Sequence, residues 1–205
     1  MGDVRVRMAQ PEDAGQLVDI YAFYVRKTAV CYDTVVPSVD ECAECMARIL
    51  RHYPYLVAQD GATGTLLGYA HTGRLNWRAG YDWSAETTIY LRPDTRGRGV
   101  GRRLYDTLEG VSQAQGILSL NACVACTQRE DEYLTNASPR FHERMGFRRV
   151  GVFHQCACKF GRWYDMVWME KMIGEHHADP AAVRPAAALA PSELAAAGLW
   201  MGEGA

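Results

Sequence analysis

A glycine-rich turn between a strand-like run and a helical run is the feature that most constrains this chain. Residues 86–91 are β-branched and aromatic, which favours a strand. Residues 96–101 read Arg-Gly-Arg-Gly-Val-Gly, and Leu104, Leu108 and Val111 then recur at helical spacing. A helix start offers unpaired N–H groups and the positive end of the helix dipole, and glycines let an anion approach the backbone. The sequence therefore predicts a phosphate-binding turn.

The spacing of the glycines separates this turn from two other phosphate-binding motifs. A P-loop requires Lys-Ser or Lys-Thr after its last glycine, and neither pair occurs here. The glycines follow G-x-G-x-G, whereas the dinucleotide-binding fingerprint is G-x-G-x-x-G. The alternative interpretation is a surface turn that binds no ligand and whose arginines are solvated. The strand and the helix that flank the turn favour the binding interpretation.

Composition and charge set broad limits on the kind of protein. The chain has 205 residues, of which 48% are hydrophobic, so it suits one domain with a full core and a tail. A formal net charge of −2 gives no overall basic field for nucleic acid. No apolar run reaches the roughly 18 residues of a membrane span, and residues 1–8 alternate like a strand rather than a signal peptide. We expect a cytoplasmic protein that partners neither nucleic acid nor membrane.

The cysteines allow two interpretations. Their odd number and the lack of a secretory segment favour reduced thiols. Two C-x-x-C pairs suggest zinc, but Cys42 and Cys45 fall in a predicted helix and Cys123 falls in a strand-like run. We interpret the thiols as buried and structural, and expect no metal site. The seven are Cys31, Cys42, Cys45, Cys123, Cys126, Cys156 and Cys158.

The pattern along the chain predicts the element order β-α-α-β-β-β-α-β-α-β-β. Pro11 opens the first helix, Ser38 and Glu41 form a capping box for the second, and Gly146 ends the last. Residues 175–205 are rich in Ala, Pro and Gly, so we expect them to be flexible or weakly helical. The expected strands are 4–8, 55–59, 65–71, 86–91, 117–124, 149–154 and 163–172. The expected helices carry residues 17–24, run from the capping box to about residue 51, run from the glycine turn to residue 115, and cover residues 138–145.

Several separate segments resemble one enzyme family in order and spacing. The glycine turn fits R/Q-x-x-G-x-G, the pyrophosphate motif of the GCN5-related N-acetyltransferases (GNAT). The chain is similar to their phosphinothricin N-acetyltransferase branch from about residue 4 to residue 172. The resemblance implies the GNAT fold over residues 1–174, an α+β (mixed α/β) domain in which helices flank a mixed, mostly antiparallel sheet, followed by the tail at 175–205. The matching segments are Ile20-Tyr21-x-x-Tyr24, Pro54-Tyr55-Leu56-Val57-Ala58, Gly68-Tyr69-Ala70, Arg78-Ala79-Gly80-Tyr81-Asp82-Trp83, Glu86 and Lys159-Phe160-Gly161-Arg162-Trp163-Tyr164-Asp165.

The same resemblance implies acetyl-CoA as the cosubstrate. In this fold the strand at 86–91 parts from its neighbour, so that backbone groups of Ile89, Tyr90 and Leu91 can hold the thioester oxygen and the pantetheine amides. The family often has an asparagine before the histidine helix; here Thr135 stands in that place, Asn136 comes one residue later and Ser138 is retained. Asn136 and Ser138 are therefore candidate cofactor contacts. The candidates for the pyrophosphate are Arg96, Gly97, Arg98, Gly99, Val100, Gly101 and Arg102.

Two residues are candidates for proton transfer. An alkyl amine is mostly protonated at neutral pH, so a base must remove a proton before the amine attacks a thioester. Glu86 shares one strand face with Thr88 and Tyr90, and the matching glutamate is the base in the family. His142 stands where many GNAT members carry a tyrosine that protonates the departing thiolate, and a histidine titrates near neutral pH. The sequence leaves open which of the two carries the proton.

Four residues are candidates for binding the acceptor. Arg78 aligns with the arginine of the family's R-x-x-Y-D-W segment, and its guanidinium fork suits a carboxylate. Tyr32, Tyr81 and Lys159 are expected to line the same pocket. The loop at 126–134 is longer and more acidic than in the phosphinothricin branch.

Together these residues predict an N-acetyltransferase that acetylates the primary amine of a small amino-acid-like substrate, of the phosphinothricin or methionine sulfoximine type. One alternative is a protein acetyltransferase acting on an N-terminus or a lysine, which an open peptide groove would favour. Another is a non-catalytic acyl-CoA-binding module, which loss of the base would favour. Family analogy also predicts a homodimer, with the apolar strand at 163–172 as its interface.

Overall fold

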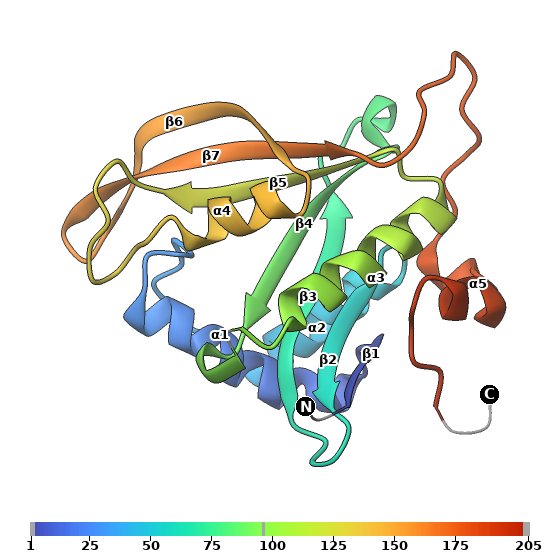
Figure 1. The fold of residues 1–205 in the computed structure, drawn as a ribbon, viewed down its shortest axis with the longest axis horizontal. Coiled ribbons are helices and arrows are strands. Elements are labelled where there is room, and N and C mark those ends of the chain that lie inside the picture. The colour runs from blue at the N-terminus through green and yellow to red at the C-terminus, as the bar shows by residue number, and fades with distance from the viewer. Residues whose placement is uncertain (1–2, 96, 203–205) are drawn as a thin grey trace.

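A single sheet of seven strands runs through the molecule, with helices on both faces (Figure 1). The structure is a computed structural model that describes residues 3–95 and 97–202. All neighbouring strands are antiparallel except β4 and β5, which confirms the predicted mixed, mostly antiparallel sheet. Across the sheet the strands are β1 (Val4–Met8), β2 (Tyr55–Asp60), β3 (Leu66–Arg74), β4 (Ser84–Leu91), β5 (Ser119–Cys126), β7 (Arg162–Met172) and β6 (Arg148–Lys159).

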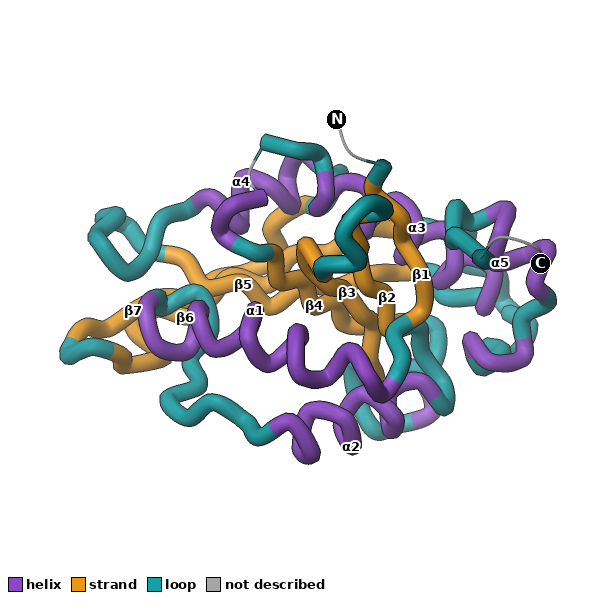
Figure 2. Tube along the Cα trace, turned by 90° about the horizontal axis from the view of Figure 1, so that it is seen from below, coloured by secondary structure: helices purple, strands orange, loops and turns teal. Residues whose placement is uncertain are grey.

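The helices form a layer on each side of this sheet, as the edge-on view shows (Figure 2). On one side lie α1 (Ala14–Lys27) and α2 (Val39–Leu50), and on the other lie α3 (Val100–Gln115) and α4 (Ala137–Arg144). The main core lies under α3, where the predicted apolar stripe of Leu104, Leu108 and Val111 is fully buried. Burial of such a stripe against a sheet is what holds a helix of this length in place.

Local signals in the sequence set several element ends. Ser38 and Glu41 form the predicted capping box of α2: the Ser38 hydroxyl accepts a hydrogen bond from the Glu41 N–H at 3.1 Å, and the Glu41 carboxylate accepts one from the Ser38 N–H at 2.7 Å. The predicted order of strands and helices is confirmed up to residue 172. Four short 3₁₀ turns add to it: Pro11–Asp13, Ala79–Tyr81, Pro93–Thr95 and Ala186–Ala188.

The bounds of most strands differ from the prediction by one or two residues, and β3 and β6 extend furthest beyond it because pairing continues there. β3 continues to Arg74, since its last residues still pair with the start of β4. β6 reaches Lys159, because its pairing with β7 resumes at Ala157 after an irregularity that begins at Phe153. A bulge of this kind interrupts the alternation that a sequence pattern relies on.

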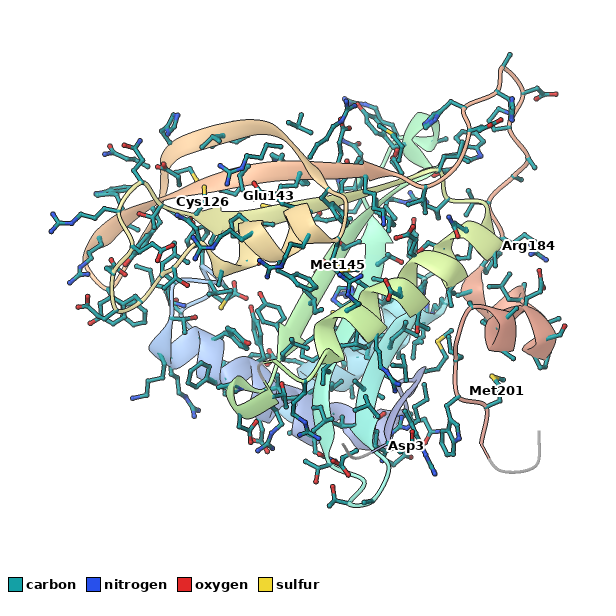
Figure 3. All side chains as sticks on the ribbon, viewed as in Figure 1. Asp3, Cys126, Glu143, Met145, Arg184 and Met201 are labelled. Carbon is teal, nitrogen blue, oxygen red and sulfur yellow. The ribbon has the colours of Figure 1, made fainter. Side chains whose placement is uncertain are left out.

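The end of the chain, expected to be flexible or weakly helical, contains one short helix and packs against the domain. Leu189 and Leu199 are 6% exposed and belong to the main core, and α5 (Pro191–Ala196) lies beside α3. Arg184 lies at the end of α3, where it donates to the Ala114 carbonyl at 2.7 Å and pairs with Glu193 (Figure 3). The composition of this segment favours disorder, but its few leucines are enough to anchor it.

The cysteines are all free thiols, but not all are buried. Cys123, Cys156 and Cys158 are exposed, which corrects the interpretation of all seven as buried structural residues. Cys156 and Cys158 lie on β6, at the open edge of the sheet, and Cys123 lies on β5 beyond the residues that pair with β4. Within the described residues no group of three or more His, Cys, Asp or Glu side chains is placed to hold a metal ion. No described helix combines the length and apolar character of a membrane span.

Candidate active site

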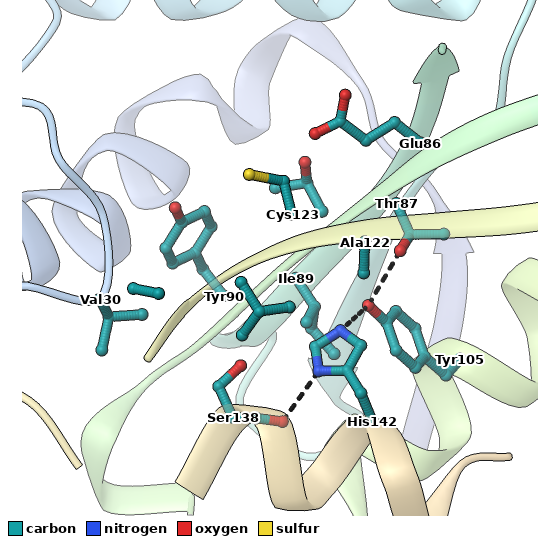
Figure 4. A pocket seen from close by; sticks show the side chains of 13 residues that line it. Val30, Glu86, Thr87, Ile89, Tyr90, Tyr105, Ala122, Cys123, Ser138 and His142 are labelled. Carbon is teal, nitrogen blue, oxygen red and sulfur yellow. Dashed lines mark hydrogen bonds between the residues drawn. The ribbon is translucent and has the colours of Figure 1, made fainter. Parts of the chain in front are cut away.

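The parallel strands β4 and β5 separate soon after they meet, and a pocket lies in the split. They pair only from Ser84 to Glu86 on β4, with Ser119 to Asn121 on β5. This confirms the predicted splaying of the strand. The pocket beyond the last pair is lined from β4, β5 and α4 by residues that include Glu86, Tyr90, Cys123, Ser138 and His142 (Figure 4).

Glu86 sits at the point where the strands part. It is half-buried, and its carboxylate forms no hydrogen bond or ion pair with another described residue. Burial raises the pKa of this carboxyl above its usual range. Tyr90 packs against Tyr21 and Tyr69 on one side of the sheet, while Thr87 contacts Tyr105 on the other. The predicted division of β4 into two faces is thus confirmed, and Glu86 is free to accept a proton.

His142 also lines the pocket, but both of its ring nitrogens already have partners. Nδ1 lies 2.9 Å from the Ser138 carbonyl, and Nε2 lies 2.8 Å from the Tyr105 hydroxyl (Figure 4). A carbonyl only accepts, so Nδ1 carries a hydrogen. The side chain is 3% exposed, and burial lowers its pKa. The ring is therefore neutral at neutral pH and accepts from Tyr105 at Nε2.

The contacts of Tyr105 continue to the backbone of β5. Its hydroxyl lies 3.2 Å from the Thr87 hydroxyl, which in turn donates to the Asn121 carbonyl at 3.1 Å. When His142 is neutral, the Tyr105 hydroxyl can donate its single hydrogen to His142 or to Thr87, but not to both. With a protonated His142, Nε2–H donates to Tyr105, Tyr105 donates to Thr87, and every contact becomes a hydrogen bond. The chain can accept a proton at His142 by rotating hydroxyl groups alone.

The glycine turn forms an open helix start beside this pocket. Gly99 is the N-cap of α3 at φ +75°, a conformation that favours glycine, and no side chain of the described residues caps the helix. At Gly101 an added Cβ would lie 3.2 Å from Leu91 and 3.3 Å from Phe141, so glycine permits the close packing of α3 there. The first N–H groups of α3 are thus available to an anion, which fits a pyrophosphate.

The arginines of the turn are placed differently from one another. Arg98 lies 3.5 Å from the Asp60 carboxylate, and Arg102 is exposed on the first turn of α3. Arg96, a predicted pyrophosphate contact, lies outside the described residues. Val100 is 1% exposed, so only its backbone can meet a ligand.

The other predicted cofactor contacts are partly engaged within the protein. β4 pairs with β3 as far as Leu91, while its opposite edge has no β5 partner beyond Glu86. The Leu91 carbonyl accepts from the Tyr24 hydroxyl. Asn136 uses both ends of its amide on the backbone of Thr127, at 3.1 and 2.8 Å. Ser138 lines the pocket directly.

The four predicted acceptor residues do not converge on one place. Arg78 precedes the 3₁₀ turn before β4 and Tyr81 is the last residue of that turn, and both are exposed. The Tyr32 hydroxyl donates to the Asp165 carbonyl at 2.6 Å. Lys159 is 5% exposed and donates to the Cys31 carbonyl at 2.8 Å, which fastens the β6–β7 hairpin to the loop between α1 and α2. Neither Tyr32 nor Lys159 lines the Glu86 pocket.

The acidic loop before α4 has a structural use. Arg162 of β7 contacts the carboxylates of Asp131 and Glu132 at 2.8 Å, and the Tyr164 hydroxyl donates to Asp131 at 2.9 Å. These bonds hold the loop against β7 instead of directing its charge at the pocket.

Several residues that line the Glu86 pocket were not predicted from the sequence, and Tyr105 and Cys123 are the two with reactive side chains nearest to the proposed chemistry. Tyr105 follows Leu104 in the helical pattern, and nothing in that pattern distinguishes it from a core aromatic residue. Cys123 is exposed to the open pocket, but the protein around it removes part of its hydration, and this desolvation, followed by the Glu86 charge, raises the pKa of the thiol to about 11. Strand alternation in β5 alone does not show which of its faces meets the split.

Comparison with known proteins identifies the family. A model described as an acetyltransferase (GNAT) domain matches residues 6–168. The chain belongs to the GNAT acetyltransferase family. This GNAT chain is 34% identical over 173 residues to phosphinothricin N-acetyltransferase of Streptomyces coelicolor, with 83% of this chain and 97% of that protein covered. It is 31% identical to L-methionine sulfoximine/L-methionine sulfone acetyltransferase of Salmonella typhimurium, with 86% and 98% covered.

The solved structures agree with this family. A phosphinothricin acetyltransferase from Sinorhizobium meliloti in complex with acetyl-CoA superposes with a TM-score of 0.78 at 30% identity. The alignment covers 87% of this GNAT chain and 93% of that structure. The predicted family and fold class are therefore confirmed.

Proposed function

We propose that this protein transfers the acetyl group of acetyl-CoA to the primary amine of a small amino-acid-like substrate. The observation that carries the proposal is the Glu86 carboxylate in the split between β4 and β5, which has no partner among the described residues. The curated relatives bear names of enzymes that acetylate phosphinothricin or methionine sulfoximine, and a solved relative holds acetyl-CoA. Residues 1–174 form the catalytic domain in this proposal, and the segment from Ala186 to Leu199 packs beside α3.

The glycine turn holds the pyrophosphate of acetyl-CoA. The uncapped N–H groups at the start of α3 supply the hydrogen bonds, with the side chains of Arg96, Arg98 and Arg102 as counter-charges. Gly97 and Gly99 shape the turn, while Val100 and Gly101 contribute backbone only. The unpaired edge of β4 at Ile89, Tyr90 and Leu91 then lies along the pantetheine, with Asn136 and Ser138 on the α4 side.

Glu86 is the general base of the proposed reaction. Its carboxylate accepts the proton that the substrate ammonium must lose, directly or through a water molecule. The free amine then attacks the thioester carbonyl, forming the amide C–N bond as the C–S bond breaks. Burial raises the pKa of Glu86 toward neutral pH. The ionised carboxylate therefore binds a proton more strongly than an exposed glutamate does.

His142 acts with Tyr105 on the departing thiolate. Both side chains line the pocket, and the imidazole reaches the Tyr105 hydroxyl through Nε2. Tyr105 gives its hydroxyl proton to the sulfur, and a protonated His142 replaces it from Nε2–H, which leaves the imidazole neutral and bonded to the same hydroxyl. Most of the remaining rate enhancement comes from holding the amine next to the thioester.

Arg78 binds the carboxylate of the acceptor. Its guanidinium forms no ion pair with another described residue, so a fork-shaped donor is available at the start of β4. Tyr81 lies in the same turn and closes one side of the entrance. Tyr32 and Lys159 contribute by holding the neighbouring loops.

The test measures release of free CoA from acetyl-CoA with a panel of amines. The panel contains phosphinothricin, methionine sulfone, common amino acids and short peptides, each with wild type, Glu86→Gln and Glu12→Gln. Turnover of an amino acid that falls about 10²–10⁴-fold in Glu86→Gln is expected. Glu12 is exposed and remote, so its variant serves as the matched control. Turnover of peptides alone, or binding of acetyl-CoA without turnover, would contradict the proposal.

We also propose that the protein is a cytoplasmic homodimer. β6 and the start of β7 expose Val150, Phe153 and Trp163, which are 61%, 57% and 63% exposed. Exposed apolar residues gathered on an edge hairpin favour a partner surface, and the free thiols suit a reducing compartment. A dimeric elution volume at micromolar concentration that becomes monomeric in Trp163→Glu is expected. A monomeric wild type would contradict the dimer.

A further inference from the structure

A second pocket lies on the other face of β4, between the strands β2–β4 and the helices α1 and α2. Its volume is about 340 Å³, within the usual range for small-molecule sites. Five aromatic side chains line this pocket, and we call it the tyrosine pocket. They are Tyr21, Tyr55, Tyr69, His71 and Tyr90.

Three polar groups in the tyrosine pocket have no partner within the described part of the chain. Tyr55 and Tyr69 are each 5% exposed, yet neither hydroxyl makes a hydrogen bond there. His71 stacks on Tyr55 at 4.7 Å; its Nδ1 lies 3.3 Å from the adjacent Thr72 carbonyl, and its Nε2 has no partner. None of the three is among the fully buried unpartnered atoms, so each reaches the open space of the pocket, where a ligand can supply its hydrogen bond.

The pocket carries no positive charge to balance an anion. No Lys or Arg is among its described lining residues, and its one carboxylate, Glu41, belongs to the capping box of α2. Burial lowers the pKa of His71 to about 4, so the ring is neutral at physiological pH. An anionic group placed here would lose its hydration without a counter-charge and would meet Glu41.

The tyrosine pocket is continuous with the position of the proposed base. Thr88 and Tyr90 line both pockets, and Thr88 lies two residues after Glu86 on the same strand face. His71 pairs with Thr88 across β3 and β4, about 7 Å along the strand from Glu86. Arg78 lies beyond the opposite end, before β4 begins. An amino acid with its amine at Glu86 and its carboxylate toward Arg78 would direct its side chain to His71.

We propose that the tyrosine pocket binds the side chain of the acceptor amino acid and that His71, Tyr55 and Tyr69 select an uncharged side chain with a hydrogen-bonding group. Sulfone, sulfoximine, amide and phenol groups fit this description, whereas a phosphinate or carboxylate does not. This inference rests on the proposed function. It specifies which members of the substrate class are preferred and which residues determine that preference.

The first test compares methionine sulfone with phosphinothricin, two amino acids of similar length that differ in side-chain charge. Alanine is the reference, because its side chain ends at Cβ and does not reach the pocket. We expect kcat/KM for methionine sulfone to exceed that for phosphinothricin by at least about tenfold, since burying an unpaired anion is costly. An equal or reversed preference would overturn the charge selection.

The second test removes the polar groups one at a time. In His71→Leu the ratio of kcat/KM for methionine sulfone to that for alanine should fall roughly 10- to 100-fold, mainly through KM, because the buried ligand group is left unpaired. His71→Gln, which keeps an amide near Nε2, should recover part of that ratio. Tyr55→Phe and Tyr69→Phe keep the ring packing and serve as probes even if the His71 variants do not fold. Tyr53→Phe removes a tyrosine hydroxyl outside the pocket and should leave the ratio unchanged.

The outcomes separate this inference from the proposed function. Turnover of amino acids with a ratio that does not respond to His71, Tyr55 or Tyr69 overturns the inference alone. No turnover of any amino acid contradicts the proposed function. Calorimetric titration of methionine sulfone into the Glu86→Gln protein, with and without Tyr55→Phe, then measures the pocket directly. Equal affinity in the two proteins would refute the assignment without reference to catalysis.

Discussion

The two sides of the sheet are built differently. On the side of β1–β4, helices cover both faces, and Leu56, Val57 and Ala58 of β2 are fully buried. The hairpin of β6 and β7 extends beyond this covered side (Figure 1), and nearly every residue of β6 is exposed. The covered side holds its shape by its own core, whereas the hairpin presents apolar surface outward. Glu86 lies where β4 of the covered side parts from β5, so the candidate site lies at the junction.

Core truncation should show the largest contrast between the two sides. Leu104→Ala removes a fully buried side chain under α3 and should cost about 2–5 kcal/mol of unfolding free energy. Val150→Ala removes an exposed side chain of β6 and should change it by less than about 0.5 kcal/mol. Both changes in unfolding free energy are measured by urea denaturation, at a protein concentration too low for dimers to form. Equal losses would show that the hairpin is as tightly packed as the covered side.

Removal of the chain after Gly174 should weaken the covered side next. Leu189 and Leu199 would leave the core under α3, and each buried leucine contributes roughly 1.5–3 kcal/mol. We expect the truncated protein to unfold at lower temperature and to keep its dimeric elution volume. Leu189→Ala in the full chain tests the same contact with a single residue. A truncated protein as stable as the full chain would show that the segment adds nothing to the core.

Tyr105→Phe tests the contact between α3 and α4 at the junction. The change leaves the His142 Nε2 without its donor, so kcat should fall about 10- to 100-fold, and the unpaired buried nitrogen should cost about 1–3 kcal/mol of unfolding free energy. Tyr53→Phe is the control for loss of a tyrosine hydroxyl elsewhere. A kcat equal to that of wild type would remove the Tyr105 hydroxyl from the proton path.

The pH dependence of the wild type should locate the base. Glu86 must be ionised to accept a proton, so kcat/KM should fall about tenfold per pH unit below the Glu86 pKa. Because burial raises that pKa, the acid limb should lie above the range of an exposed glutamate. The limb should be absent from the residual activity of Glu86→Gln. A limb that persists in this variant would assign the titration to another group.

The capping box of α2 should give the smallest effect. Ser38→Ala leaves the Glu41 N–H without its side-chain partner and should cost about 1 kcal/mol, measured by urea denaturation. Glu41→Gln keeps the reciprocal bond to the Ser38 N–H and should cost less. The reverse order would show that charge at the helix start matters more than the hydrogen bonds.

The sequence predicted best where a signal is local. Ser38 with Glu41, the stripe of Leu104, Leu108 and Val111, and the alternation around Glu86 each depend on neighbours within a few residues, and each appears as expected. The element order and the family follow from these signals together with the glycine turn.

The sequence failed where contacts join distant parts of the chain. Lys159 was expected in the acceptor pocket, but its amine bonds the Cys31 carbonyl, which lies 128 residues earlier. Tyr105 meets His142 across two helices, and the leucines of the tail meet α3 from a segment whose composition favours disorder. The periodicity of a sequence does not reveal such long-range contacts, because only the packed fold brings the partners together.

The outer edge of β1 has a consequence for how copies of the chain can assemble. Its outward carbonyls are occupied: Val4 accepts from Arg103 at 2.6 Å, Val6 from the Trp200 N–H at 2.7 Å, and Met8 from Arg7 at 3.0 Å. A strand from another molecule therefore finds no free row of acceptors there. Among the described residues the β6 edge is therefore the more open place for the sheet to extend, and pairing through one edge of each molecule joins two copies without continuing into a fibre.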